Sequence, residues 1–303
     1  MRQKRRGNFD FFSSCSHFVP GVADLFIILA LFLAGSLLGS LASAAFMKLF
    51  SGADAEYGML VAYPISFIPL LIYACVKSRS NSYNSVGFKL DSANFGGRGG
   101  ALCALVAVVG TFCIAYLSDA LTTLLPQMPD FLKDALDSLT GGIFWADFLC
   151  AAILAPVLEE WMCRGLVLRG LLNNRRRDGS TMKPVWAIVW SAFFFAVVHM
   201  NPWQAIPAFL VGCLFGYVYY KTGSLKLTML MHFFNNGLAV VLSHIDGLEE
   251  METWADVLPE REYWLVFVCC VIAMVLAVLF FKNVKPLRPQ GSCDEVPALF
   301  DQI

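Results

Sequence analysis

Long apolar runs separated by short polar stretches fill the sequence between residues 22 and 281. Most runs approach 20 residues, the length that an α-helix needs to cross about 30 Å of hydrocarbon. Pro202 interrupts one longer run and forbids a continuous helix there. The pattern predicts an all-α fold, a polytopic transmembrane helical bundle of about eight spans. The expected spans are 22–47, 57–76, 101–125, 145–169, 184–200, 204–220, 227–245 and 263–281.

Composition agrees with a membrane protein. Hydrophobic residues make up 58% of the chain and charged residues only 15%, with a mean hydropathy of +0.64. A soluble domain of this length carries more charge, so the lipid bilayer is an expected partner. The net charge of −1 gives no indication of a nucleic-acid partner. The ten cysteines lack metal-ligand spacing and are expected to be small packing residues.

Positive charges gather on one set of loops. With Arg169, this set carries 18 of the 22 Lys and Arg residues, whereas the opposite set carries twelve Asp and Glu residues. Basic loops stay in the cytoplasm, so both termini are predicted to be cytoplasmic. We further expect a short interfacial helix over 129–139 and a disordered tail beyond Pro286. The basic set comprises the N-terminal segment 1–21, 77–100, 170–183, 221–226 and the tail from Lys282.

Three charged residues lie well inside the fourth expected span, in the stretch Leu158-Glu-Glu-Trp-Met-Cys-Arg164. An unpaired charge at the bilayer centre costs about 2.5–3.5 kcal/mol or more. Glu160 and Arg164 are four residues apart, so they share a helix face and can form an ion pair. Glu159 points about 100° away from Glu160 and has no local partner. A structural ion pair therefore explains Glu160 and Arg164 but leaves Glu159 unexplained.

Two further spans contribute polar side chains. His199 ends an aromatic run, and His232 and Asn236 lie four residues apart on one helix face. A lone histidine in a span is often only a packing residue. Two histidines, a surplus carboxylate and an asparagine within spans favour a functional site instead.

These residue types suit the hydrolysis of a carbonyl compound. A carboxylate and a histidine could hold a water and take its proton, and His232 and Asn236 could donate hydrogen bonds to the developing oxyanion. Glu159, His199 and His232 would also suit a catalytic zinc ion, although the zinc motif H-E-x-x-H is absent. We favour chemistry without an obligatory zinc and leave the metal alternative open.

The motifs Glu159-Glu160-x-x-x-Arg164, Phe195-x-x-x-His199 and His232-x-x-x-Asn236 resemble those of the CPBP family. This family comprises CAAX proteases and bacteriocin-processing (Abi) proteins, including the type II CAAX prenyl endopeptidases. The resemblance implies an intramembrane endopeptidase in which Glu159 and His199 activate water and His232 and Asn236 support the oxyanion. Glu160, Arg164 and Phe195 would be supporting residues.

By this resemblance the chain divides into four parts. A basic N-terminus (1–21) and N-terminal helices without catalytic motifs (22–140) precede a CPBP-like catalytic core (141–245). An outer acidic loop, the last helix and a cytoplasmic tail (246–303) follow. By analogy, the membrane is a bacterial inner (plasma) membrane and the substrate is a peptide or a membrane protein. Nothing in the sequence indicates an oligomeric state.

Two other function classes are compatible with the same residues. A non-proteolytic scaffold or regulator would keep the fold without cleaving a partner. A proton-coupled transporter would also use buried carboxylates and histidines, but the sequence contains no inverted repeat and no pair of broken helices.

Overall fold

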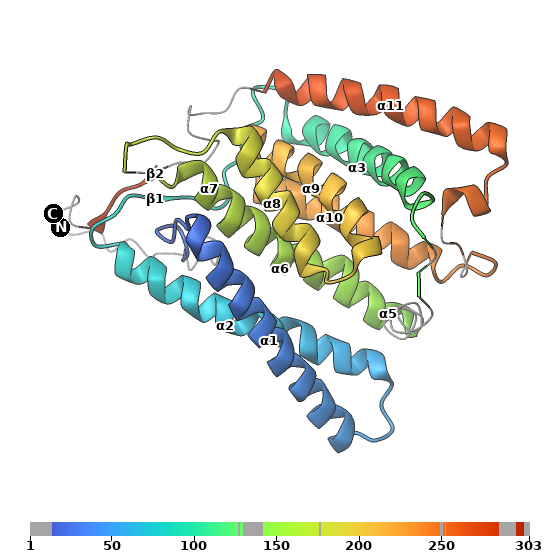
Figure 1. Ribbon diagram of the computed structural model, residues 1–303, viewed down its shortest axis with the longest axis horizontal. Coiled ribbons are helices and arrows are strands. Elements are labelled where there is room, and N and C mark those ends of the chain that lie inside the picture. The colour runs from blue at the N-terminus through green and yellow to red at the C-terminus, as the bar shows by residue number, and fades with distance from the viewer. Residues whose placement is uncertain are drawn as a thin grey trace.

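The fold is a bundle of α-helices, seen in a computed structural model (Figure 1). The predicted all-α class is confirmed, because the only strands of the described residues are two of two residues each. The structure describes residues 14–126, 128–129, 142–175, 177–248, 251, 253–284 and 295–299.

Each expected span corresponds to a helical segment. The turn predicted at Pro202 is present, because α8 ends at Val198 and α9 begins at Pro202. Five helices, α1, α2, α3, α10 and α11, are each long and apolar enough to cross a membrane. Their length and apolar composition support an integral membrane protein. The long helices are α1 (Val22–Leu49), α2 (Ala55–Asn81), α3 (Gly100–Thr122), α8 (Pro184–Val198), α9 (Pro202–Thr222), α10 (Leu225–Leu242) and α11 (Glu260–Lys282).

The fourth expected span is continuous but changes its helical type. Two π-helical stretches, η1 and η2, flank the short α6 that carries Glu159 and Glu160. Wider π turns occur often at functional sites. Carbonyls of both stretches accept hydrogen bonds from neighbouring helices, Ala151 from Asn236 and Cys163 from Ser191. The segments are α5 (Phe144–Asp147), η1 (Phe148–Leu154), α6 (Ala155–Glu160), η2 (Trp161–Leu168) and α7 (Arg169–Asn173).

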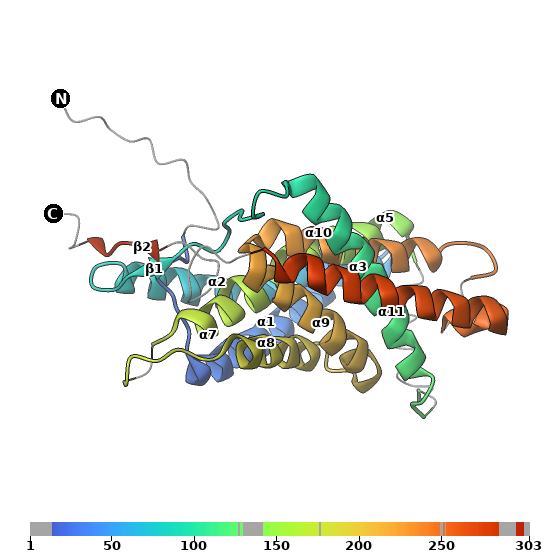
Figure 2. The same ribbon diagram turned by 90° about the horizontal axis from the view of Figure 1, so that it is seen from above.

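The helices are arranged in pairs around this span. Figure 1 shows α3 and α11 along one edge of the bundle and α1 and α2 along the opposite edge, with α6, α8, α9 and α10 between them. Figure 2 shows the same bundle from above. The α1–α2 pair is tightly packed, because a Cβ at Gly35 would lie 1.9 Å from the Ser66 carbonyl oxygen.

One end of the bundle is closed by residues from distant parts of the chain. Strand β1 (Gly87–Phe88) pairs antiparallel with β2 (Glu295–Val296). The expectation of a disordered tail beyond Pro286 is therefore wrong for residues 295 and 296. The interfacial helix expected over 129–139 falls on residues 130–139, which lie outside the described residues.

Arg169 is fully buried at this end, although the sequence places it among the loop cations. Its guanidinium group donates to the carbonyl oxygens of Ser16, Phe18 and Phe88. A buried charge needs such partners, because its desolvation is costly. Arg169 therefore links the segment before α1 and strand β1 to the end of the fourth expected span.

Candidate active site

Glu160 and Arg164 form the predicted ion pair. The Arg164 Nη1 atom lies 2.5 Å from Glu160 Oε1, and both side chains are completely buried. Arg164 Nη2 donates to the Gly212 carbonyl of α9 at 3.1 Å. The guanidinium group also lies 4.5 Å from the centre of the Phe195 ring. The pair thus joins the span that contains α6 to α8 and α9, which agrees with a supporting role.

His232 contacts both neighbouring carboxylates. Its Nδ1 atom lies 3.1 Å from Glu160 Oε1, and its Nε2 atom lies 3.9 Å from Glu159 Oε2. The ring is buried, with a 3% exposed fraction for the residue. We call Glu159, Glu160 and His232 the carboxylate–histidine cluster.

One oxygen of the Glu159 carboxylate accepts a hydrogen bond, whereas the other has no hydrogen-bond partner among the described residues. Tyr63 of α2 donates its hydroxyl hydrogen to Glu159 Oε1. The other oxygen, Oε2, is buried and has no hydrogen-bond partner within the described part of the chain. An unpartnered carboxylate oxygen is costly in an apolar interior, so this position is suited to a water or a substrate proton.

The Phe195 ring connects the two histidines. Its centre lies 4.8 Å from the His199 ring and 5.6 Å from the His232 ring, with nearly perpendicular planes in both cases. His199 Nδ1 lies 2.7 Å from the Phe195 carbonyl oxygen. A carbonyl oxygen only accepts, so Nδ1 is the donor there. In the neutral ring this leaves Nε2 as an acceptor for a water proton.

A cavity of about 340 Å³ lies beside these rings, and we call it the His199 cavity. Its walls include His199, His232 and Asn236, together with Asp119 of α3 and Gln204 of α9. Polar side chains at such a site can hold water or a peptide group. The cavity could therefore accommodate a scissile peptide bond, and His232 both lines it and contacts the two glutamates.

Both polar atoms of the Asn236 side-chain amide form hydrogen bonds. Its Nδ2 group donates to the Ala151 carbonyl at 2.9 Å, and its Oδ1 atom accepts from Asn235 Nδ2 at 3.1 Å. An amide nitrogen has two hydrogens, so one remains for a further acceptor. This arrangement fixes the orientation of Asn236 at the cavity wall.

The predicted site residues are thus brought into one region, but not all into mutual contact. Glu159, Glu160 and His232 are in contact, and His199 joins His232 through Phe195 and the cavity. No hydrogen bond or ion pair links Glu159 to His199 among the described residues. The described part of the chain also contains no group of three or more His, Cys, Asp or Glu side chains arranged to hold a metal ion. The alternative zinc set, Glu159, His199 and His232, is therefore not assembled.

Tyr63 is the main site residue that sequence reasoning missed. It lies in the second expected span, where no motif was recognised. The available signal was the phenol itself, since a tyrosine hydroxyl within an apolar span needs a hydrogen-bond partner. Its partner could not be identified without knowing how α2 packs against α6.

The comparison with protein families supports the motif analysis. The family model for "Type II CAAX prenyl endopeptidase Rce1-like" matches residues 141–238, about a third of the chain. The matched range includes all three motifs but not Tyr63. No curated protein and no solved structure matches the chain. The three motifs and this match together support a CAAX protease (CPBP) family assignment, carried by an Rce1-like domain over residues 141–238.

Proposed function

We propose that the chain is an intramembrane endopeptidase that cleaves a peptide or a membrane protein. One observation carries this proposal: motif residues of the Rce1-like domain form the carboxylate–histidine cluster, and His232 of that cluster lines a cavity with His199 and Asn236. The lipid bilayer around the site is proposed to be a bacterial inner membrane, with both termini cytoplasmic.

In the proposed reaction, Glu159 and His199 act on one water molecule. They remove its proton while its oxygen adds to the carbonyl carbon of the scissile peptide bond. Collapse of the tetrahedral intermediate breaks the C–N bond, and the proton passes to the leaving amine. The products are a carboxylate and an amine, so no nucleophilic side chain is consumed.

The oxyanion of the intermediate would be stabilised by His232 Nε2 and Asn236 Nδ2. His232 Nδ1 faces Glu160 Oε1 and acts as a donor there. The oxyanion role therefore requires His232 to carry a proton on both nitrogens.

The His199 role is tested with a matched pair of histidine variants. Purified protein in lipid nanodiscs is incubated with a peptide library, and cleavage is followed by mass spectrometry. His199→Ala should lower turnover by about 10²–10⁴-fold, the range for lost general acid–base catalysis. His17→Ala, outside the spans, should retain activity. Full activity of His199→Ala would contradict the role of His199. A wild-type chain that cleaves no peptide or membrane protein but retains a membrane partner would favour the scaffold alternative.

A further inference from the structure

Tyr63 belongs to a helix outside the family-matched segment, yet it contacts the central carboxylate. It lies in α2 (Ala55–Asn81) and donates its hydroxyl hydrogen to Glu159 Oε1 across 96 residues of sequence. Its ring packs against Phe67 of the same helix, with 5.6 Å between the ring centres. The hydroxyl is therefore held in place from the α2 side.

We propose that Tyr63 is a positioning residue that orients the Glu159 carboxylate for water activation. This inference rests on the proposed peptidase function. With Oε1 bound to Tyr63, the second oxygen, Oε2, is the one directed toward His232 Nε2 at 3.9 Å. The same oxygen has no other partner in the described structure, so it is the oxygen available to accept a proton from water.

The physical reason for such a residue lies in the torsional freedom of glutamate. Three rotatable bonds separate the carboxylate from the backbone, and a misplacement of about 1 Å can cost about 10²-fold in rate. The neighbouring pair also acts on the Glu159 carboxylate, because the Glu160 charge repels it and the Arg164 charge attracts it. A hydrogen bond from a phenol to a carboxylate is charge-assisted and therefore short and strong. Tyr63 thus restricts Glu159 to one orientation.

Tyr63 does not line the His199 cavity, whose walls come from α3, α8, α9 and α10. Because Tyr63 lies outside this cavity, its loss should change the rate of the chemical step and not the binding of substrate. Tyr63→Phe removes one oxygen and keeps the ring. It should lower kcat by about 10- to 100-fold, as expected for a lost charge-assisted hydrogen bond, while KM stays within about twofold. Tyr63→Met, a flexible apolar replacement, should show the same fall in kcat.

Tyr73→Phe is the matched control on the same helix. The Tyr73 ring packs edge-on against Phe18, with 5.6 Å between the ring centres, away from Glu159. This variant should keep the wild-type kcat. In a Glu159→Gln background, Tyr63→Phe should cause no further loss, because residues that act through one another are not additive. A purely structural Tyr63 would instead lower the rate by the same factor in both backgrounds.

The outcomes distinguish this inference from the proposed function. A wild-type chain that cleaves no substrate would overturn the peptidase function itself. An active wild type, an inactive Glu159→Gln variant and an unchanged kcat in both Tyr63 variants would overturn only the positioning role. A rise in KM without a fall in kcat would also overturn it, because Tyr63 would then serve substrate binding.

Discussion

Glu159 and Glu160 are neighbours in the chain, but their carboxylates have different surroundings. Glu160 is completely buried and bound to Arg164, whereas Glu159 is held by Tyr63 and keeps one oxygen without a partner. Removing the Glu160 charge would leave Arg164 buried with only neutral partners. Breaking a buried ion pair in this way costs about 3–5 kcal/mol of stability. The two glutamine substitutions should therefore have different effects: Glu159→Gln should lower activity, and Glu160→Gln should lower stability.

Part of this residue-scale picture follows from the sequence. The Glu160–Arg164 pair was predicted from their four-residue spacing, and it is present. The contact of His232 with both glutamates and the Tyr63 hydrogen bond were not predicted. These contacts join separate helices, and their distances depend on packing that no local spacing determines.

At the scale of elements, the positions of the helices were predictable because each span is a long apolar run. The π-helical stretches η1 and η2 were not, because they reflect hydrogen-bond registers inside one apolar segment. The close contact of α1 and α2 does have a sequence signature, Gly35-Ser-Leu-Leu-Gly39. Glycines four residues apart allow helix backbones to approach closely in membranes.

Gly35→Ala tests the importance of that contact. The added Cβ would meet the Ser66 backbone carbonyl oxygen at 1.9 Å, so α1 and α2 must separate. We expect a loss of about 1–3 kcal/mol in stability, typical of overpacking, measured as a lower Tm in detergent. Gly52→Ala is the control, because nothing lies within 4 Å of a Cβ there. Equal Tm values for the two variants would show that the close approach is not required.

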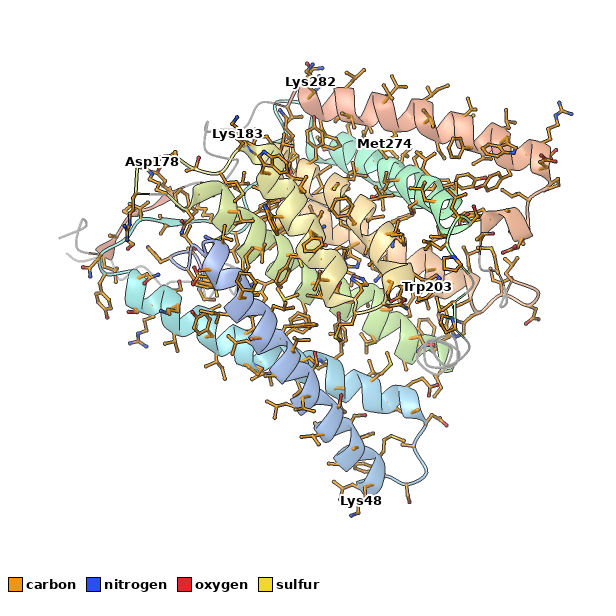
Figure 3. The ribbon with its side chains drawn as sticks, in the orientation of Figure 1. Lys48, Asp178, Lys183, Trp203, Met274 and Lys282 are labelled. Atoms are coloured by element: carbon orange, nitrogen blue, oxygen red, sulfur yellow. The ribbon has the colours of Figure 1, made fainter. Side chains whose placement is uncertain are left out.

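On the scale of the whole molecule, several lysines lie at the ends of helices, whereas Glu159, Glu160 and Arg164 lie inside the bundle. Figure 3 places Lys48, Lys183 and Lys282 at helix ends. Residues near both termini meet at one end, where His17 Nε2 lies 3.3 Å from the Pro297 carbonyl oxygen. Loop charges predict which end of the bundle is cytoplasmic. The pairing of β1 with β2 could not be predicted, because each strand has only two residues.

Cysteine labelling tests the predicted orientation. In a cysteine-free background, Asp246→Cys should react with a membrane-impermeant maleimide added to intact cells, because its acidic loop is predicted to face outward. Asn84→Cys lies in the basic loop before α3 and should react only after permeabilisation. Both positions are exposed, so accessibility within the fold does not limit labelling. The reverse labelling pattern would reject the orientation.

Glu159 is proposed to perform chemistry while Glu160 maintains structure, and a paired measurement tests this difference directly. Peptide cleavage and Tm are measured for Glu159→Gln and Glu160→Gln in the same detergent. Glu159→Gln should retain a Tm close to that of the wild type and lose about 10²–10⁴-fold in turnover. Glu160→Gln should unfold at a clearly lower temperature, because Arg164 loses its buried counter-charge. A stable and fully active Glu159→Gln enzyme would contradict the claim.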